Sequence, residues 1–370
     1  MAVQNQDGFR VQVQQELAST PYKATSLTPL TGGTANFIFK ATLETPLPDG
    51  TAEVAVKHGQ GYVASRPSFA IPTSRCEVEK DCLDHLSQLP HSISPAFAIG
   101  TPKILHFAPD TNTQVQEYLP DAISLKEYAL EHYKAPTSPS FKPQCLQLGR
   151  CLGHWLRAFH DWTGEVSAPK EFKETLVRNR EMQTLKNTIN YKQVLGMADK
   201  SEILAPAKEV FQMISDASDA ELQDNSKMLP VHGDFWTGNV LLPNIPIEDG
   251  VKTPLRVIDW EMAQLGMRPL DLGQMIAEMW QLKLYKDIDA GIWLIEGFAN
   301  GYGEIDDEFA FRTIIHVGIH LICFGSQTPG WGTKERAEEL VKIGRDVVVN
   351  AWNTDIDTFK GHPLECLFPE

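Results

Sequence analysis

The sequence lacks the features of secreted, membrane-spanning and nucleic-acid-binding proteins. Its first residues, Met1 to Glu16, are polar and rich in glutamine, without the basic start or apolar run of a secretory signal. The most apolar late stretch, Val317 to Phe324, is interrupted by His320 and is much shorter than a membrane span. A formal net charge of −15 leaves no basic stripe for nucleic-acid phosphates. We therefore expect a cytoplasmic protein without membrane or nucleic-acid partners.

Cysteine is scarce, and its spacing does not indicate a metal site. The six cysteines are scattered over 370 residues without paired zinc spacing, so reduced thiols are the simplest interpretation. His316, His320 and Cys323 share a helix face by their spacing. Because they lie in an apolar helix without a fourth ligand, zinc is disfavoured and lining an acceptor pocket is the better interpretation. With 42% hydrophobic residues, the chain can bury one large core or two lobes.

The most informative stretch runs from Leu229 to Leu242, where Asp234 and Asn239 lie five residues apart on a polar loop before an apolar strand. A second apolar strand delivers Asp259. Phosphoryl transfer needs a carboxylate beside the attacking hydroxyl and oxygen ligands for Mg²⁺. We assign Asp234 as the base or hydroxyl-orienting residue, and Asn239 and Asp259 as magnesium ligands. The alternative is a polar turn between two strands, with the aspartates as caps.

Two more acidic residues follow Asp259. Glu261 lies two residues further on, so an extended strand would project both carboxylates to the same side and make Glu261 an additional magnesium ligand. A surface glutamate at a strand end is the alternative. Asp271 follows the turn Gly266 to Pro269 and precedes the apolar helix Met275 to Leu284, which predicts a helix cap.

The first third of the chain predicts a small sheet with one helix before it. We expect a helix and three strands, with these ranges: Gln4–Ala18, Ser26–Leu30, Phe37–Leu43 and Thr51–Lys57. The turn after the first strand contains Gly32, Gly33 and Asn36, and glycines there let backbone N–H groups approach phosphate oxygens closely. A glycine pair that only reverses the chain is the alternative.

Lys57 ends the third strand, where a kinase needs a cation for the α- and β-phosphates. A solvated strand-end lysine is the alternative, and Glu79 decides between them. A helix over Ser74–Leu89 could present Glu79 toward Lys57, whereas Glu77 would face elsewhere.

The residues of the polar loop and of the Asp259 strand resemble those of a known enzyme superfamily. The run from His232 to Asn239, with the Asp259 strand, resembles the catalytic loop and metal segment of the aminoglycoside phosphotransferase and choline kinase superfamily, relatives of the protein kinases. The letters Trp-Thr-Gly-Asn resemble the fructosamine and hydroxyalkylamine kinase branches, and Asp259-Trp260-Glu261 resembles the Asp-x-Glu of methylthioribose kinases. Similarity to the hydroxytryptamine kinases of psilocybin biosynthesis extends along most of the chain, from Gly32-Gly33 to Trp331-Gly332.

The resemblance implies roles for further residues. It supports Glu79 through Arg75-x-x-x-Glu79, and it identifies Glu117 and Leu119 as hinge residues whose backbone groups would meet adenine. It also agrees with a structural role for Asp271 in bracing the catalytic loop. Protein kinases that are activated by phosphorylation carry Arg before the catalytic Asp, but this chain has Gly233 and lacks Ala-Pro-Glu.

We therefore expect an α+β, bilobal, protein-kinase-like fold. Residues 1–117 would form a nucleotide-binding lobe with an antiparallel sheet, and residues 118–370 a mainly helical catalytic and acceptor-binding lobe. ATP and Mg²⁺ are the expected cofactors, and the expected reaction moves the γ-phosphoryl group to a hydroxyl of a small molecule. The acceptor could be a hydroxyalkylamine, a hydroxyindole or a sugar-like compound. The alternative function is a catalytically silent nucleotide-binding module that acts through a partner.

Overall fold

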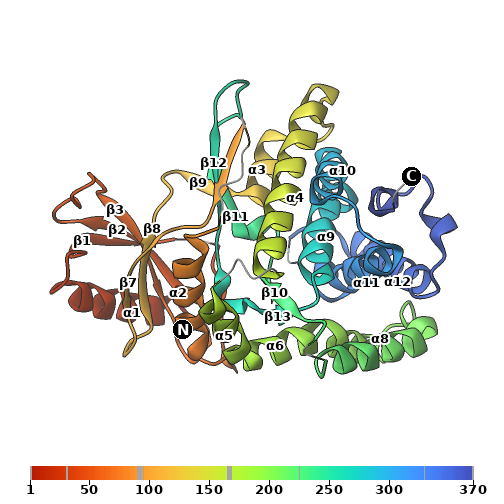
Figure 1. Ribbon diagram of the computed structural model, residues 1–370, viewed down its shortest axis with the longest axis horizontal. Helices are drawn as coiled ribbons and strands as arrows, with labels where there is room; N and C mark the ends of the chain where they lie inside the picture. The colour runs from red at the N-terminus through yellow and green to blue at the C-terminus, as the bar shows by residue number, and fades with distance from the viewer. Residues whose placement is uncertain are drawn as a thin grey trace. The chain divides into compact units, whose positions relative to one another are not determined.

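The computed structural model describes residues 2–30, 32–89, 94, 96–164, 169–224, 226–328 and 330–368. The chain divides into two compact units (Figure 1). The first comprises Met1–Gln88, Thr101–Pro120 and the short segment Ile258–Glu261. The second comprises Leu89–Gly100, Asp121–Val257 and Met262–Glu370.

The first unit is built on a five-stranded antiparallel sheet in the order β1-β2-β3-β8-β7. Its strands are β1 Ala24–Pro29, β2 Phe37–Leu43, β3 Glu53–His58, β7 Ile104–Ala108 and β8 Thr113–Glu117, and its helices are α1 Ala2–Leu17 and α2 Ser74–Leu86. A small hairpin joins β4 Tyr62–Val63 to β5 Arg66–Ala70. Every second residue of β2 is buried, as expected for a strand with one face toward a core. That core includes Val13 and Leu17 of α1.

The second unit is mainly helical. It contains a four-stranded sheet in the order β6-β12-β11-β9 and a separate pair, β10 with β13. Its strands are β6 Phe97–Gly100, β9 Ala122–Ser124, β10 Leu229–Val231, β11 Val240–Pro243, β12 Thr253–Val257 and β13 Gln264–Gly266. Its helices are α3 Leu125–His132, α4 Lys142–Gly164, α5 Lys170–Arg178, α6 Arg180–Asn187, α7 Gln193–Ala198, α8 Lys208–Glu221, α9 Pro269–Lys286, α10 Ala290–Tyr302, α11 Asp307–Cys323 and α12 Lys334–Trp352.

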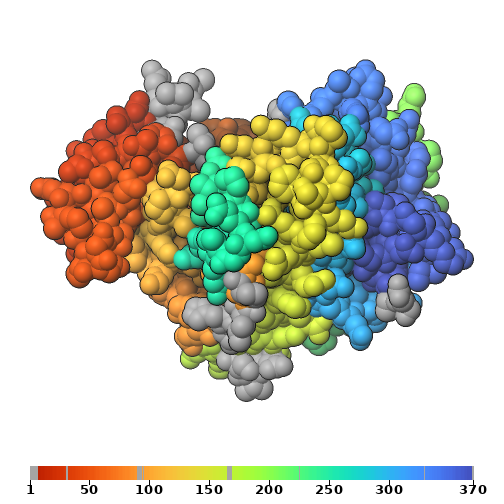
Figure 2. All heavy atoms as spheres, turned by 90° about the horizontal axis from the view of Figure 1, so that it is seen from above, coloured from red at the N-terminus to blue at the C-terminus, as the bar shows by residue number. Residues whose placement is uncertain are grey.

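Segments far apart in sequence lie together in this second unit. Helices α4 and α10 pack closely, and Figure 2 shows the yellow surface around α4 beside the blue C-terminal helices. The apolar face predicted on α4 is buried, including Leu148, Leu152 and Phe159. The antiparallel sheet of the first unit and the helical majority of the second confirm the predicted α+β fold class.

The apolar segment around α11 is longer than the sequence suggested. Asp307–Gln327 is long and apolar enough to cross a membrane, but 78% of its most apolar window is buried inside the protein. The buried core helix of a folded domain passes the same test of length and composition. We therefore interpret α11 as a core helix.

Candidate active site

A cluster of charged side chains lies in the first unit around Lys57 of β3. The Lys57 Nζ atom is 2.8 Å from a carboxylate oxygen of Glu79 on α2 and 2.5 Å from Asp259 Oδ1. Glu261 Oε2 is 3.8 Å away. Burial by itself would lower the pKa of Lys57, but these three carboxylates outweigh burial and raise the pKa well above its ordinary value. Lys57 is therefore a permanent, buried cation.

A second buried cation, Arg75, completes this cluster from the first turn of α2. Its Nε donates to Glu261 Oε2 at 3.1 Å, and its Nη2 donates to Asn36 Oδ1 at 2.9 Å. The Asn36 amide donates in turn to Glu261 Oε2 at 2.6 Å. Asn36 is therefore part of this network, and Glu261, only 4% exposed, is not the surface residue of the alternative interpretation.

The local backbone that unites Asp259 and Glu261 differs from the expected extended strand. Strand β12 ends at Val257, Asp259 has a left-handed φ of 68°, and Trp260–Met262 forms a 3₁₀ turn. The expectation of an extended strand was therefore wrong, although the two carboxylates do lie together.

The composition of this cluster suits a divalent cation. Ligand oxygens of Glu79, Asp259 and Glu261 all lie within 4.8 Å of one another. When all are ionised, three carboxylates lie against two cations, Lys57 and Arg75, in the part of the chain that the structure describes. Burial is the main cause that raises the pKa of Glu79, and the neighbouring carboxylates of Asp259 and Glu261 raise it further. A hard cation such as Mg²⁺, which prefers carboxylate oxygens, would balance the excess of carboxylates.

The predicted catalytic loop lies in the second unit and follows β10. Asp234 lies on this loop, and Thr237–Asn239 forms a 3₁₀ turn before β11. Gly233 has φ of 78°, and a Cβ atom there would lie 2.2 Å from the Met262 carbonyl oxygen, so glycine is required at this position.

Asp271 holds the start of this loop. Its carboxylate accepts backbone N–H bonds from His232 at 2.8 Å and from Gly233 at 2.9 Å, and it contacts His160 Nε2 at 3.1 Å. Asp271 lies inside the first turn of α9, and Arg268 is the N-cap residue. The predicted helix cap was therefore wrong: the carboxylate binds the catalytic loop and not the end of its own helix.

Three side chains fix the Asp234 carboxylate. Its Oδ1 accepts from Lys186 Nζ at 3.0 Å and from Gln274 Nε2 at 2.7 Å, and its Oδ2 accepts from Asn239 Nδ2 at 3.2 Å. Burial raises the pKa of Asp234, but the Lys186 ammonium and the Gln274 bond outweigh burial, so the pKa lies below its ordinary value. Asn239 Nδ2 also donates to the Asp234 carbonyl oxygen at 2.9 Å, which leaves Asn239 Oδ1 for a metal.

The remaining residues that were predicted to bind the nucleotide lie at turns and strand ends of the first unit. Gly32 has φ of 106°, and no described atom beyond its chain neighbours lies within 4 Å of a Cβ added there, while a Cβ at Gly33 would lie 2.5 Å from Ile38 Cδ1. Glu117 ends β8, and its N–H donates to the Lys103 carbonyl oxygen. In the described chain the N–H of Leu119, just beyond the strand, has no protein acceptor.

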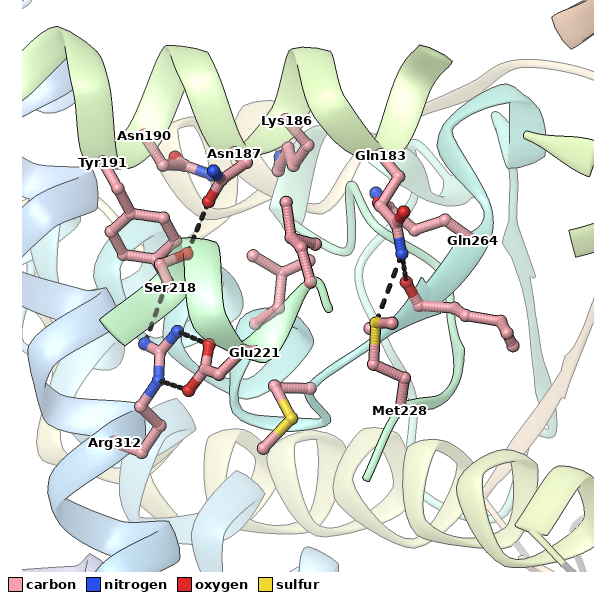
Figure 3. Close-up of a pocket in the computed structure, with 15 residues that line it drawn as sticks. Gln183, Lys186, Asn187, Asn190, Tyr191, Ser218, Glu221, Met228, Gln264 and Arg312 are labelled. Carbon is pink, nitrogen blue, oxygen red and sulfur yellow. Dashed lines mark hydrogen bonds and ion pairs between the residues drawn. The ribbon is translucent and has the colours of Figure 1, made fainter. Parts of the chain in front are cut away.

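Lys186 and Gln274 were not predicted as site residues, because lysine and glutamine side chains usually point to solvent. Beside Lys186 is a cavity of about 40 Å³ between α6, α8, α11 and the segment after β13 (Figure 3). Arg312 and Glu221 form a two-bond ion pair on its wall. Both amide atoms of Asn190, which also lines the cavity, are buried and lack a partner among the described residues. The cavity is therefore polar and large enough for water.

Elsewhere in the second unit, one carboxylate and two indole rings surround the ammonium of Lys126. Lys126 Nζ is 3.1 Å from Glu278 Oε2, 4.2 Å from the ring centroid of Trp331 and 5.1 Å from that of Trp236. Burial opposes ionisation of Glu278, but His320 and Lys126 lower its pKa to about 2. The indole N–H of Trp236 is buried and has no partner in the described chain. We call Glu278, Trp236 and Trp331 the aromatic box.

The helix face of His316, His320 and Cys323 is engaged in other contacts. His316 Nδ1 bonds to the Tyr191 hydroxyl, His320 Nε2 to Glu278, and Cys323 Sγ donates to the Asn190 carbonyl oxygen. Within the described ranges, the only acidic, histidine or cysteine group arranged for a metal is the one formed by Glu79, Asp259 and Glu261.

The chain matches the profile of one enzyme family and is similar to several known proteins. The profile of the phosphotransferase enzyme family matches residues 45–311. Phosphotransferase FrzJ of Cladobotryum sp is 28% identical over 366 residues, covering 95% of this chain and 94% of that protein. The 4-hydroxytryptamine kinase of Psilocybe cyanescens is 22% identical over 297 residues, covering 79% and 78%.

Solved structures share the fold. A choline/ethanolamine kinase family protein from Mesorhizobium loti matches with a TM-score of 0.51 at 15% identity, covering 93% of this chain and 98% of that one. Choline kinase from Cryptosporidium parvum matches with a TM-score of 0.51 at 12% identity, covering 97% and 98%. At such low identity these matches show the fold alone.

Proposed function

The chain belongs to the phosphotransferase enzyme family and is a small-molecule kinase, and from that premise we propose that it transfers the γ-phosphoryl group of ATP to the hydroxyl of a hydroxyalkylamine. The observation that carries this proposal is the Asp234 carboxylate, which is fixed through both oxygens by three side chains and held below its ordinary pKa. An ionised, oriented carboxylate is what a hydroxyl acceptor needs.

We assign the chemical steps as follows. Asp234 accepts or orients the proton of the acceptor hydroxyl. Lys57 holds the phosphates, and Glu79, 2.8 Å from its ammonium, orients it. Asn239, Asp259 and Glu261 would hold magnesium, which would supply positive charge for the phosphates. Because Glu261 Oε2 already accepts from Asn36 and Arg75, this network fixes where the Glu261 carboxylate points.

Nucleotide binding is assigned to residues 1–117, and acceptor binding and catalysis to residues 118–370. Gly32 and Gly33 suit a turn that approaches phosphate oxygens, with Asn36 tying the end of that turn to Arg75. Glu117 and Leu119 would offer backbone groups to adenine, and the N–H of Leu119, which has no acceptor within the described ranges, supports this role. The six cysteines are free thiols, which agrees with a cytoplasmic location.

The aromatic box favours a cationic acceptor. Lys126 Nζ occupies this box, where a carboxylate and two indole faces stabilise positive charge, and we propose that a substrate ammonium takes its place when the acceptor binds. On α9, Gln274 contacts Asp234, and Glu278 lies one turn further on, about 6 Å along the helix axis. Amino alcohols whose hydroxyl and ammonium are a few bonds apart fit this spacing better than a neutral sugar does.

The test is magnesium-dependent ADP release with a panel of amino alcohols, hydroxyindoles, aminoglycosides and sugars. We expect amino alcohols to stimulate release, and Asp234→Ala to lower kcat about 100-fold to 10,000-fold while ATP still binds. Glu278→Gln should raise KM for amines more than for neutral alcohols, whereas surface Asp289→Asn should change neither. ATP binding without ADP release across the panel would instead support the silent nucleotide-binding module.

A further inference from the structure

Lys186 is a buried lysine whose contacts converge on the catalytic loop. It is 3% exposed, and its ammonium donates to Asp234 Oδ1 at 3.0 Å and to Gln274 Oε1 at 2.8 Å. Gln274 Nε2 donates to the same Asp234 oxygen at 2.7 Å. The three side chains therefore form a closed triangle, and one oxygen of the carboxylate receives two donors.

The helix that carries Lys186 is anchored to the strand beside the catalytic loop. Asn179 Nδ2, at the start of α6, donates to the Ala263 carbonyl oxygen at 2.8 Å, and Gln183 Nε2 donates to the Leu265 carbonyl oxygen at 2.6 Å. Leu265 in β13 pairs with Pro230 in β10, the strand that leads into the loop. The position of Lys186 relative to Asp234 is therefore set by side-chain hydrogen bonds from α6 to backbone carbonyl oxygens.

Gln274 is anchored separately, through the backbone at the start of the same loop. It lies on α9 three residues after Asp271, whose carboxylate holds the N–H groups of His232 and Gly233. Two independently anchored elements thus aim their donors at one oxygen. Such an arrangement prevents rotation of the carboxylate about its Cβ–Cγ bond.

We propose that Lys186, supported by Gln274, is a positioning residue that locks Asp234 so that Oδ2 faces the acceptor hydroxyl. This inference rests on the proposed kinase function. Asp234 Oδ1 is filled by its two donors, and among the described residues Oδ2 has only the longer bond of 3.2 Å from Asn239. Without Lys186 the carboxylate can turn, and misplacement of a reacting group by about 1 Å can cost about 100-fold in rate.

The adjacent polar cavity offers a way to separate this role from simple packing. Lys186 lines the cavity, and its third N–H has no partner among the described residues. Figure 3 shows Lys186 on the helix beside Asn187 and Asn190, above the space that these residues line. Removal of the lysine side chain would join its volume to the cavity, so that a small primary amine could place an ammonium where Nζ was.

The experiment compares full-length Lys186→Ala, Lys186→Arg, Gln274→Ala and the double variant Lys186→Ala/Gln274→Ala, with Lys192→Ala as the control. Lys192 lies in the next helical turn and pairs with the half-exposed Asp219, away from Asp234. We expect Lys186→Ala to lower kcat about 100-fold with KM for ATP almost unchanged. Lys186→Arg should restore part of kcat, and Lys192→Ala should retain nearly all of it.

Methylamine should restore kcat of Lys186→Ala in a saturable manner, whereas trimethylamine should not. The double variant should be little worse than Lys186→Ala, because both residues act through one carboxylate. A Lys186→Ala enzyme with kcat within threefold of the unmodified protein would overturn the inference, as would a loss that methylamine and Lys186→Arg both fail to restore. If the unmodified protein turned over no acceptor, the proposed function would fail instead.

Discussion

Among single residues, Asp271 illustrates why a carboxylate is needed where an amide of the same shape is not enough. Its oxygens meet three donors: two backbone N–H groups and the Nε2 of His160. His160 Nε2 must carry its proton, because an ionised carboxylate can only accept, and His160 Nδ1 then accepts from the Tyr302 hydroxyl at 2.9 Å. Burial lowers the pKa of His160, so the ring stays neutral. Asp271 is therefore the common acceptor of this network.

We predict that Asp271→Asn lowers the free energy of unfolding of the second unit by about 2–4 kcal/mol. Bonds to a charged acceptor contribute about 1.5–3 kcal/mol each, and the asparagine NH₂ would face at least one N–H group. Turnover should fall as well, because the loop that carries Asp234 loses its anchor. Urea unfolding followed by tryptophan fluorescence measures the first effect, and ADP release measures the second.

Asp289→Asn is the matched control for this prediction. Its pair with Lys283 is about 40% exposed on both sides, and such pairs contribute at most about 1 kcal/mol. An Asp271→Asn protein as stable as Asp289→Asn would show that the catalytic loop does not depend on this carboxylate.

Some of these residues could be predicted from sequence and others could not. The pairing of Lys57 with Glu79 was expected from a strand end and a helix face, and the two side chains do form a hydrogen bond. Lys186 could not be predicted, because its burial depends on the polar partners Asp234 and Gln274, which are 48 and 88 residues away. The left-handed backbone of Asp259 was missed because φ above zero is uncommon for a residue other than glycine. Local patterns therefore predict pairs on regular elements and miss long-range polar contacts.

Among whole elements, the contact between α4 and α10 depends on the absence of side chains. A Cβ at Gly149 would lie 2.3 Å from the Leu294 carbonyl oxygen, and one at Gly153 would lie 2.1 Å from that of Phe298. In the facing helix, a Cβ at Gly297 would lie 2.3 Å from the Leu146 carbonyl oxygen. The two backbones thus touch along a seam of glycines.

We predict that Gly153→Ala destabilises the second unit by about 1–3 kcal/mol, the usual cost of overpacking. Alanine favours an isolated helix by about 1 kcal/mol over glycine. A loss of stability in Gly153→Ala would therefore come from the contact between α4 and α10. Gly196→Ala in α7 is the control: no atom lies within 4 Å of the added Cβ, and stability should not fall. Thermal unfolding of both variants measures the difference, and equal midpoints would contradict the tight seam.

Elements with strong periodicity were the most predictable. Strand β2 was expected at Phe37–Leu43 and has those bounds, because alternating burial has a clear signature. The helix predicted over Ser74–Leu89 ends earlier, at Leu86. Strand β6 has only four residues and pairs in parallel with β12, which follows more than 150 residues later. A strand so short carries too little pattern to be recognised, and its partner is not visible from its own sequence.

At the scale of the whole molecule, the first unit is discontinuous and depends on a distant segment for its charge balance. Ile258–Glu261 belongs to it and supplies two of the three carboxylates around Lys57 and Arg75. Both cations are buried: Lys57 is 7% and Arg75 is 0% exposed. A fragment that ends at Pro120 would leave Glu79 as their only acidic partner in this cluster.

We therefore predict that residues 1–120 alone do not unfold cooperatively. Loss of the partner of a buried charge costs about 3–5 kcal/mol, and this fragment would lose two such partners against a typical domain stability of about 5–15 kcal/mol. The measurement is urea unfolding of the fragment followed by circular dichroism. Replacement of both cations and of Glu79 by apolar side chains, Lys57→Met with Arg75→Met and Glu79→Met, should restore cooperativity, because the fragment then holds no charge of this buried cluster. If the unmodified fragment melted as sharply as the triply substituted one, the charge of Ile258–Glu261 would not be what holds the first unit together.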